Sequence, residues 1–194
     1  GPEIMVAMDA HWKFGVNDAI KLAQRLEPLD LVWLEDPTPP HNIDALVQVT
    51  RSTRTPILTG ESLYTKWGYR DLIEKQAARI ISPDIPKMGG LSEFKKVADH
   101  ADMYYIAMAP HNVASPIGTV ACAHVCAAIN NYLVMEYHAH DVPWWGDLVE
   151  GGNPLIDGYI PLNNKPGHGL TLNEDVAKAH LKKGSSYFGE TPHA

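Results

Sequence analysis

Six short apolar runs recur along the 194-residue chain at regular intervals. Each run leads into a segment with helical periodicity, and each ends at an ionisable residue: Asp9, Glu35, Glu61, Asp84, His111 and Glu136. The intervals between these residues are 26, 26, 23, 27 and 25 positions, which is about the length of one strand and one helix. Strand–helix alternation of this kind predicts a parallel sheet with helices packed on it.

Each of the six predicted strands ends in an ionisable residue, which favours a TIM-type (β/α) barrel over an open, doubly wound sheet. In a barrel the carboxyl ends of all strands gather at one face, whereas an open sheet would spread them along an edge. About six βα units are present, two fewer than an eight-stranded barrel needs. We therefore expect an incomplete catalytic barrel in residues 1–140, followed by a C-terminal tail, residues 141–194, that packs on it.

Several local features refine this prediction. Asn17, Asn42 and Ser92 are placed to cap three of the helices, and Pro116 belongs in the first turn of another. The two cysteines, Cys122 and Cys126, are four residues apart in an apolar helical pattern, which favours buried thiols over a metal pair. The absence of a disulfide framework indicates a reducing, cytoplasmic compartment.

The charge balance excludes some partners. The formal net charge is -7, from 23 acidic residues against 16 Lys and Arg, and nucleic acids or anionic membranes would require basic patches instead. No run of 18 apolar residues predicts a membrane span, and the first ten residues do not resemble a signal peptide. We expect a small-molecule substrate and a homo-oligomer.

Five of the six predicted strand ends carry a carboxylate, and in one barrel mouth these charges would repel each other. No Lys or Arg stands at a strand end to balance them. A divalent cation held by three of the carboxylates would do so, and oxygen ligands favour Mg²⁺ over zinc. Glu35 is then a metal ligand, while Asp36 should point away toward a cap or a surface partner, because adjacent strand residues face opposite sides.

Asp9, Glu35 and Glu61, one per successive strand, resemble the metal triad of the enolase superfamily. The segments SPDIPKMGGLSE and MAPHN resemble its mandelate racemase subgroup, in which an Asp and a His from neighbouring strands form a dyad. The resemblance implies that Mg²⁺ binds the carboxylate of a 2-hydroxy acid and stabilises the enediolate formed when the α-proton is removed. It also implies a small N-terminal capping domain, and two strands ahead of Asp9, that this sequence lacks; the tail would return to that domain.

The resemblance assigns a role to each remaining strand-end residue. His111 resembles the general base, Asp84 its orienting partner, and Glu136 the acid that hydrogen-bonds the substrate carboxylate. His11, two residues after Asp9 on what we expect to be an extended chain, resembles the general acid of galactonate dehydratase-type enzymes. The alternatives are a turn or cap acid for Asp84, a loop histidine with satisfied hydrogen bonds for His111, and an exposed loop histidine for His11.

The leading functional hypothesis is a hydro-lyase that converts a 2,3-dihydroxy sugar acid into a 2-keto-3-deoxy acid. A racemase or epimerase is the runner-up, and it would need a second base from an absent strand. A truncated barrel that binds a metal or a partner without turnover is the non-catalytic alternative.

Overall fold

The computed structural model describes residues 3–138 and 142–188 of the chain. Five strands form one parallel sheet in the order of the sequence: β1 (Met8–Asp9), β2 (Leu34–Glu35), β3 (Ile57–Thr59), β4 (Ile80–Ile81) and β5 (Ala107–Met108). The sixth predicted strand is reduced to a parallel bridge between Met108 and Tyr132. Its backbone still follows β5, because Leu133 N donates to Met108 O and Glu136 N donates to Pro110 O.

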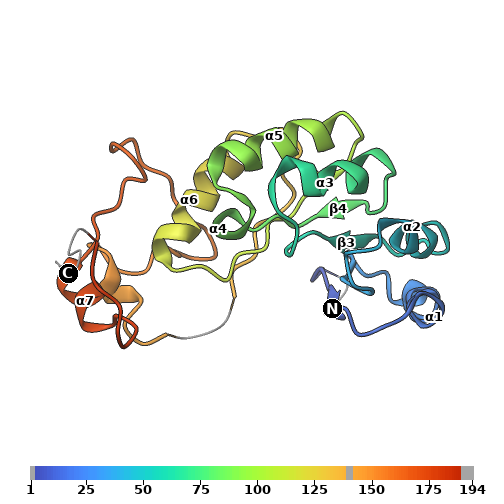
Figure 1. Ribbon diagram of the computed structural model, residues 1–194, viewed down its shortest axis with the longest axis horizontal. Coiled ribbons are helices and arrows are strands. Elements are labelled where there is room, and N and C mark those ends of the chain that lie inside the picture. Colours follow the sequence, from blue (N-terminus) through green and yellow to red (C-terminus); the bar gives the residue numbers. More distant parts are fainter. Residues whose placement is uncertain (1–2, 139–141, 189–194) are drawn as a thin grey trace.

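A helix follows each strand and covers the outer side of the sheet (Figure 1). These helices are α1 (Val16–Leu26), α2 (Ile43–Arg51), α3 (Thr65–Glu74), α5 (Leu91–Asp102) and α6 (Pro116–Cys126). The short α4 (Ile85–Met88) precedes α5. Helix α1 packs against α2, and α5 packs against both α3 and α6. The ribbon is an open arc and not a closed ring, so the barrel is incomplete as predicted.

Two of the predicted helix caps are wrong. Asn42 does cap α2, accepting a hydrogen bond from Ala45 N at 3.1 Å, and Pro116 begins α6. In α1, however, the helix has already started at Val16, so Asn17 lies inside it after the cap residue Gly15. In α5 the cap is Gly90 and not Ser92. Gly90 has φ +86°, a left-handed conformation that glycine adopts without strain, and this sharp turn starts the helix before Ser92.

Alternation along the strands divides the apolar residues between two faces. Leu34, Ile57 and Ile81 join a large core with the helices. Their neighbours on the opposite face form a smaller cluster of Leu58, Ile80 and Ala109, against which Trp33, Ala107 and Val134 pack. This second cluster is what would fill the interior of a barrel. We call it the interior cluster.

The chain beyond the sheet contains the 3₁₀ turn η2 (Gly146–Leu148) and the helix α7 (Glu174–Ala179). Two antiparallel bridges order it, Val149 with Leu172 and Ile156 with Tyr159. One contact back to the helical layer is a hydrogen bond between His124 Nε2 and His168 O at 3.2 Å. Both cysteines are buried and free, as predicted. The longest described helix, α5, has 12 residues, too few to cross a bilayer.

Candidate active site

Asp84 and His111 come together beyond the ends of two neighbouring strands. Each lies three residues after a residue of the β4–β5 pair Ile81 and Met108, so the parallel register brings them to the same level. His111 Nδ1 lies 2.7 Å from Asp84 Oδ2. A carboxylate at this distance favours the tautomer with a proton on Nδ1, which leaves Nε2 as the basic nitrogen.

Asp84 also caps a helix. Its Oδ1 atom accepts a hydrogen bond from Lys87 N at 3.0 Å at the start of α4, and Lys87 Nζ lies 3.5 Å from Oδ2. The cap contact and the histidine contact therefore coexist, one on each oxygen. Burial alone would raise the pKa of Asp84, but the hydrogen bonds from His111 and from Lys87 N outweigh it and lower the pKa. The carboxylate is held in its charged form.

The other ring nitrogen of His111 faces acidic groups. Nε2 lies 3.2 Å from Glu61 Oε2 and 3.9 Å from Glu136 Oε2. Burial alone would lower the pKa of His111, but the bond to Asp84 and the charges of Glu136 and Glu61 raise it above its ordinary value. Nε2 is thus the basic nitrogen of a partly buried imidazole next to a cluster of carboxylates.

That cluster, which we call the carboxylate group, consists of Glu35, Asp36 and Glu61. One oxygen from each residue lies within 4.8 Å of the others. Two of its members are predicted metal ligands. The expectation that Asp36 points to a surface partner is wrong: its side chain is 1% exposed and accepts a hydrogen bond from the Thr59 hydroxyl. The backbone of Asp36 is left-handed, with φ +41°, so the strand alternation ends at Glu35.

The electrostatics of the carboxylate group fit a cation. Burial and the nearby charge of Asp9 raise the pKa of Glu35 to about 8. Burial, which outweighs the Thr59 hydrogen bond, raises the pKa of Asp36 to about 6. Asp36 Oδ2 is buried and makes no hydrogen bond of normal geometry among the described residues. Three oxygen donors with no Lys or Arg partner among the described residues are the type of ligand set that a hard divalent cation takes.

Asp9 lies at the edge of this site. It is paired in register with Glu35, and both line a cavity of about 240 Å³ together with His111 and Glu136. The Asp9 side chain is exposed and is not part of the carboxylate group, so its role as a ligand stays a prediction.

His11 differs from expectation in its backbone. The chain was expected to stay extended from Asp9 to His11, but His11 and Trp12 have φ +45° and +63° and form a turn. His11 N donates to Asp9 Oδ1 at 2.8 Å, and the exposed His11 ring stacks on Trp12 with ring centroids 4.2 Å apart. The turn after β1 redirects the ring, and its role as an acid stays a prediction.

The sequence interpretation missed three residues that hold the acidic side chains. Trp33 Nε1 donates to Glu35 Oε2 at 3.2 Å, and Thr59 donates to Asp36. Asn112 N donates to Glu136 Oε2 at 2.8 Å and so fixes the last acid beside β5. Strand periodicity could have found Trp33, because residues two apart share a face.

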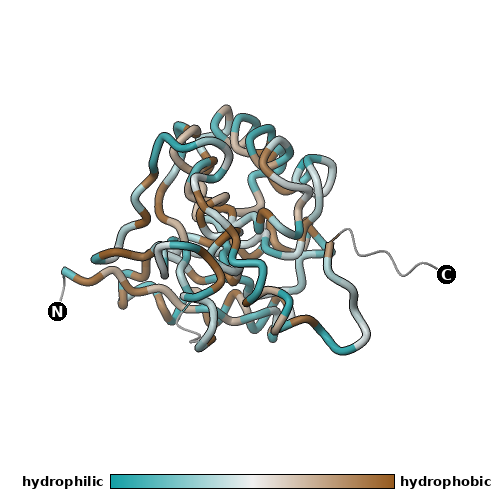
Figure 2. Tube along the Cα trace, turned by 90° about the vertical axis from the view of Figure 1, so that its left-hand side faces the viewer, coloured by the Kyte–Doolittle hydropathy of each residue, from teal (hydrophilic) through white to brown (hydrophobic). Residues whose placement is uncertain are grey.

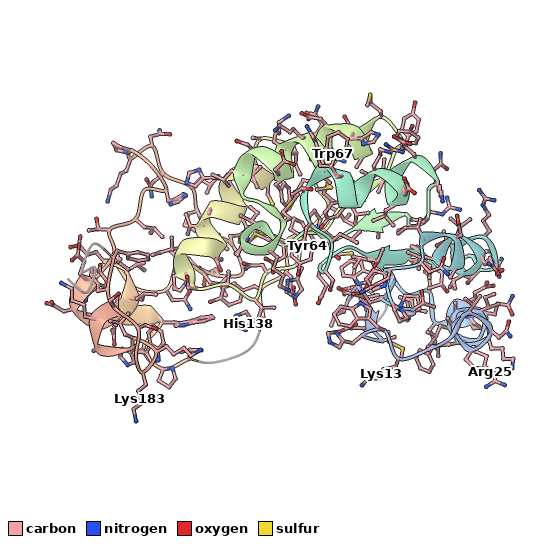
Figure 3. All side chains as sticks on the ribbon, viewed as in Figure 1. Lys13, Arg25, Tyr64, Trp67, His138 and Lys183 are labelled. Carbon is pink, nitrogen blue, oxygen red and sulfur yellow. The ribbon has the colours of Figure 1, made fainter. Side chains whose placement is uncertain are left out.

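Other concave or aromatic surfaces do not belong to this site. A larger cavity, of about 940 Å³, lies at the opposite ends of the strands, bordered by Arg51, Lys75 and Arg79. Tyr64 and Trp67, labelled in Figure 3, are exposed where the chain enters α3 after Glu61. The chemistry-bearing residues are therefore concentrated at the carboxyl ends of β1–β5.

A family model described as "Enolase C-terminal domain-like" matches residues 1–176. The chain belongs to the enolase C-terminal domain-like family. This membership agrees with the parallel α/β architecture and with acidic residues beyond successive strands.

Relatives of this family member are dehydratases by name. The chain is 50% identical over 190 residues to a "D-xylonate dehydratase" of Haloferax volcanii, covering 98% of this chain and 46% of the relative. It is 37% identical over 181 residues to a "D-galactonate dehydratase family member" of Pseudarthrobacter chlorophenolicus, covering 92% and 44%. The chain thus spans about half the length of these curated relatives.

A solved structure shares the fold closely. The mandelate racemase/muconate lactonizing enzyme-like protein of Rubrobacter xylanophilus superimposes with a TM-score of 0.92 at 49% identity. The match covers 97% of this chain and 48% of that one. The enolase superfamily resemblance and the incomplete barrel are both confirmed.

Proposed function

We propose that this chain supplies the metal ligands and the general base of an acid-sugar dehydratase. The observation that carries the proposal is the Asp84–His111 pair, in which the second imidazole nitrogen, Nε2, faces the carboxylate group. The names of the relatives, xylonate and galactonate dehydratases, support a sugar acid as substrate. The reaction would convert a 2,3-dihydroxy acid into a 2-keto-3-deoxy acid.

Glu35 and Glu61 would hold a divalent cation, Mg²⁺ by the chemistry of the donors, with Asp9 or Asp36 as the third carboxylate. Among the described residues, no Lys or Arg pairs with the carboxylate group, and Asp36 Oδ2 accepts no hydrogen bond of normal geometry; both observations support this fit. When bound, the cation would lower the energy of negative charge developing on the substrate carboxylate.

The chain's own residues would move the protons. His111 Nε2 would take the proton from C2, while Asp84 holds Nδ1 and stabilises the imidazolium that forms. Glu136, fixed by Asn112 N, would hydrogen-bond the substrate carboxylate. His11 would give a proton to the hydroxyl on C3 as the C3–O bond breaks, so that water leaves and the resulting enol becomes the 2-keto acid.

The test is product analysis with full-length protein, Mg²⁺ and a panel of aldonic and aldaric acids. We expect a 2-keto product that semicarbazide traps, and no exchange of the C2 proton with deuterated solvent in the His111→Asn variant. Exchange by wild-type protein on its best substrate without any keto product would indicate an epimerase. Cation binding without exchange or product would indicate the non-catalytic alternative.

His11→Asn separates dehydration from proton abstraction. Removing the C2 proton does not need His11, but a hydroxide leaves poorly unless it is protonated. We expect dehydration to fall by about 10²–10⁴-fold while C2 proton exchange persists. A variant that dehydrates at the wild-type rate would rule out His11 as the acid and leave the reaction itself standing.

A further inference from the structure

Trp33 contacts the carboxylate group through its indole nitrogen. It lies just before β2, two residues ahead of Glu35, and its Nε1–H donates to Glu35 Oε2 at 3.2 Å. The ring packs on the interior cluster and lines the same cavity as Glu35 and His111. One side chain thus connects the apolar residues on the sheet's inner face to a carboxyl oxygen of Glu35.

Each of the three members of the carboxylate group contacts a side chain that holds it, which we call its anchor, and the three anchors lie on different segments of the chain. The Thr59 hydroxyl holds Asp36, and His111 Nε2 contacts Glu61. For Glu35 the indole is the side-chain hydrogen bond seen among the described residues, and it engages one oxygen only. Glutamate has three rotatable side-chain bonds, so without this anchor its carboxylate would sample several orientations.

We propose that Trp33 is a positioning residue that fixes the Glu35 carboxylate for cation binding, an inference that rests on the metal site of the proposed function. The indole N–H holds Oε2 in place. The orientation of Oε1 is then set by the rigid indole ring, and no longer by free rotation about the bonds of the glutamate side chain. Groups that orient metal ligands in this way typically account for 10–100-fold in metal affinity or activity. The competing explanation is that Trp33 only fills space.

The experiment measures Mn²⁺ binding to the full-length protein from the electron paramagnetic resonance signal of the free ion. Mn²⁺ takes the same oxygen ligands as Mg²⁺ and can be detected directly without substrate. Glu35→Gln first establishes the site, because removing a ligand charge should abolish binding. Trp33→Phe then keeps an aromatic ring and removes the N–H. We expect it to bind Mn²⁺ at least ~10-fold more weakly than wild type.

Two controls separate the hydrogen bond from packing. Ile80→Val removes one methylene from the interior cluster without touching Glu35, and should leave the Mn²⁺ affinity within about twofold. A tryptophan analogue at position 33 with sulfur in place of the indole N–H keeps the ring shape, and should weaken binding as Trp33→Phe does. This analogue also covers the case in which Trp33→Phe does not fold.

Two outcomes would overturn the positioning role and leave the metal site intact. In the first, the sulfur-containing variant binds Mn²⁺ as tightly as wild type. In the second, this variant and Ile80→Val lose the same amount of Mn²⁺ affinity. Wild-type protein that binds no Mn²⁺, or that binds it equally well as Glu35→Gln, would overturn the metal site and this inference with it.

Discussion

At the scale of single residues, a carboxylate can serve two partners because it has two oxygen atoms. Asp84 uses Oδ1 to cap α4 and Oδ2 to hold His111. Fixing one oxygen on a backbone N–H also fixes the direction of the other. The helix cap is therefore part of what orients the imidazole, and the two contacts can be separated by substitution.

Asp84→Asn and Asp84→Ala should differ in stability but not in activity. Asn caps helices about as well as Asp, whereas Ala typically costs about 1 kcal/mol, so urea unfolding should show Asp84→Ala as the less stable variant by about that amount. Neither variant gives His111 an anionic acceptor, so both should lose C2 proton exchange by at least ~10-fold. Full exchange in Asp84→Asn would show that Asp84 acts as a cap alone.

At the scale of elements, consecutive βα units are tied together by side chains that reach from one unit to the next. Glu27, in the 3₁₀ turn η1 (Glu27–Leu29) after α1, accepts hydrogen bonds from the Thr53 hydroxyl at 2.9 Å, Arg54 N at 2.9 Å and Arg54 Nε at 3.2 Å. These donors precede β3. The turn thus links the end of the first helix to the entry of the third strand.

The Glu27 contacts predict a pH-dependent stability. Hydrogen bonds from Arg54 N and the Thr53 hydroxyl lower the pKa of Glu27 below 4.5, its ordinary value. Its ionised form therefore stabilises the fold above pH 4.5, and the contribution is lost as the pH falls through the lowered pKa. Glu27→Gln should be less stable than wild type at pH 7, and the two should converge in acid, as measured by urea unfolding across pH.

Asp18→Asn is the matched control, because the contact that Asp18 makes among the described residues is an exposed ion pair with Lys21 at 3.7 Å. It should follow the wild-type curve at every pH. A Glu27→Gln penalty that is the same at pH 7 and in acid would mean that the charge of Glu27 does not contribute.

At the scale of the whole molecule, the sheet has two open sides. β1 pairs with β2 alone, and the chain at Tyr132 pairs with β5 alone, among the described residues. The N-terminal segment leading to β1 is a hydrophobic stretch at the periphery of the trace (Figure 2), and Ile4 and Met5 are 71% and 73% exposed. Open strand edges with apolar side chains favour association with other chains. The expected homo-oligomer stays a prediction.

The 194-residue chain by itself should therefore self-associate through this edge. Ile4→Lys combined with Met5→Lys should shift sedimentation velocity profiles toward the monomer, because charge on an open edge opposes pairing. Leu29→Lys changes an equally apolar residue, 64% exposed on η1, and should have little effect. An equal shift toward the monomer in both variants would mean that the added charge opposes association in general, and that the strand edge is not the interface.

The sequence by itself determined the parallel α/β architecture, the order of its strands and the family resemblance. Of the predicted strand ends, Asp9 and Glu35 are the last residues of strands, whereas Glu61, Asp84 and His111 lie two or three residues beyond theirs. The architecture and the strand order follow from periodicity and spacing, which act locally along the chain, whereas the resemblance rests on the acidic triad and on the segments SPDIPKMGGLSE and MAPHN. Asn42 and Pro116 were predictable for the same reason. In contrast, α1 starts directly after the extended Gly15, and α5 starts where the left-handed Gly90 turns the backbone.

Only the tertiary structure decided which acidic residues meet. The rule that neighbouring residues face opposite sides holds within β2 but ends at Asp36, where a left-handed backbone and the Thr59 hydroxyl bring its carboxylate to Glu35 and Glu61. The same kind of turn redirects His11 after β1. Dihedral angles beyond a strand end are set by contacts between segments far apart in sequence, and spacing alone does not encode them.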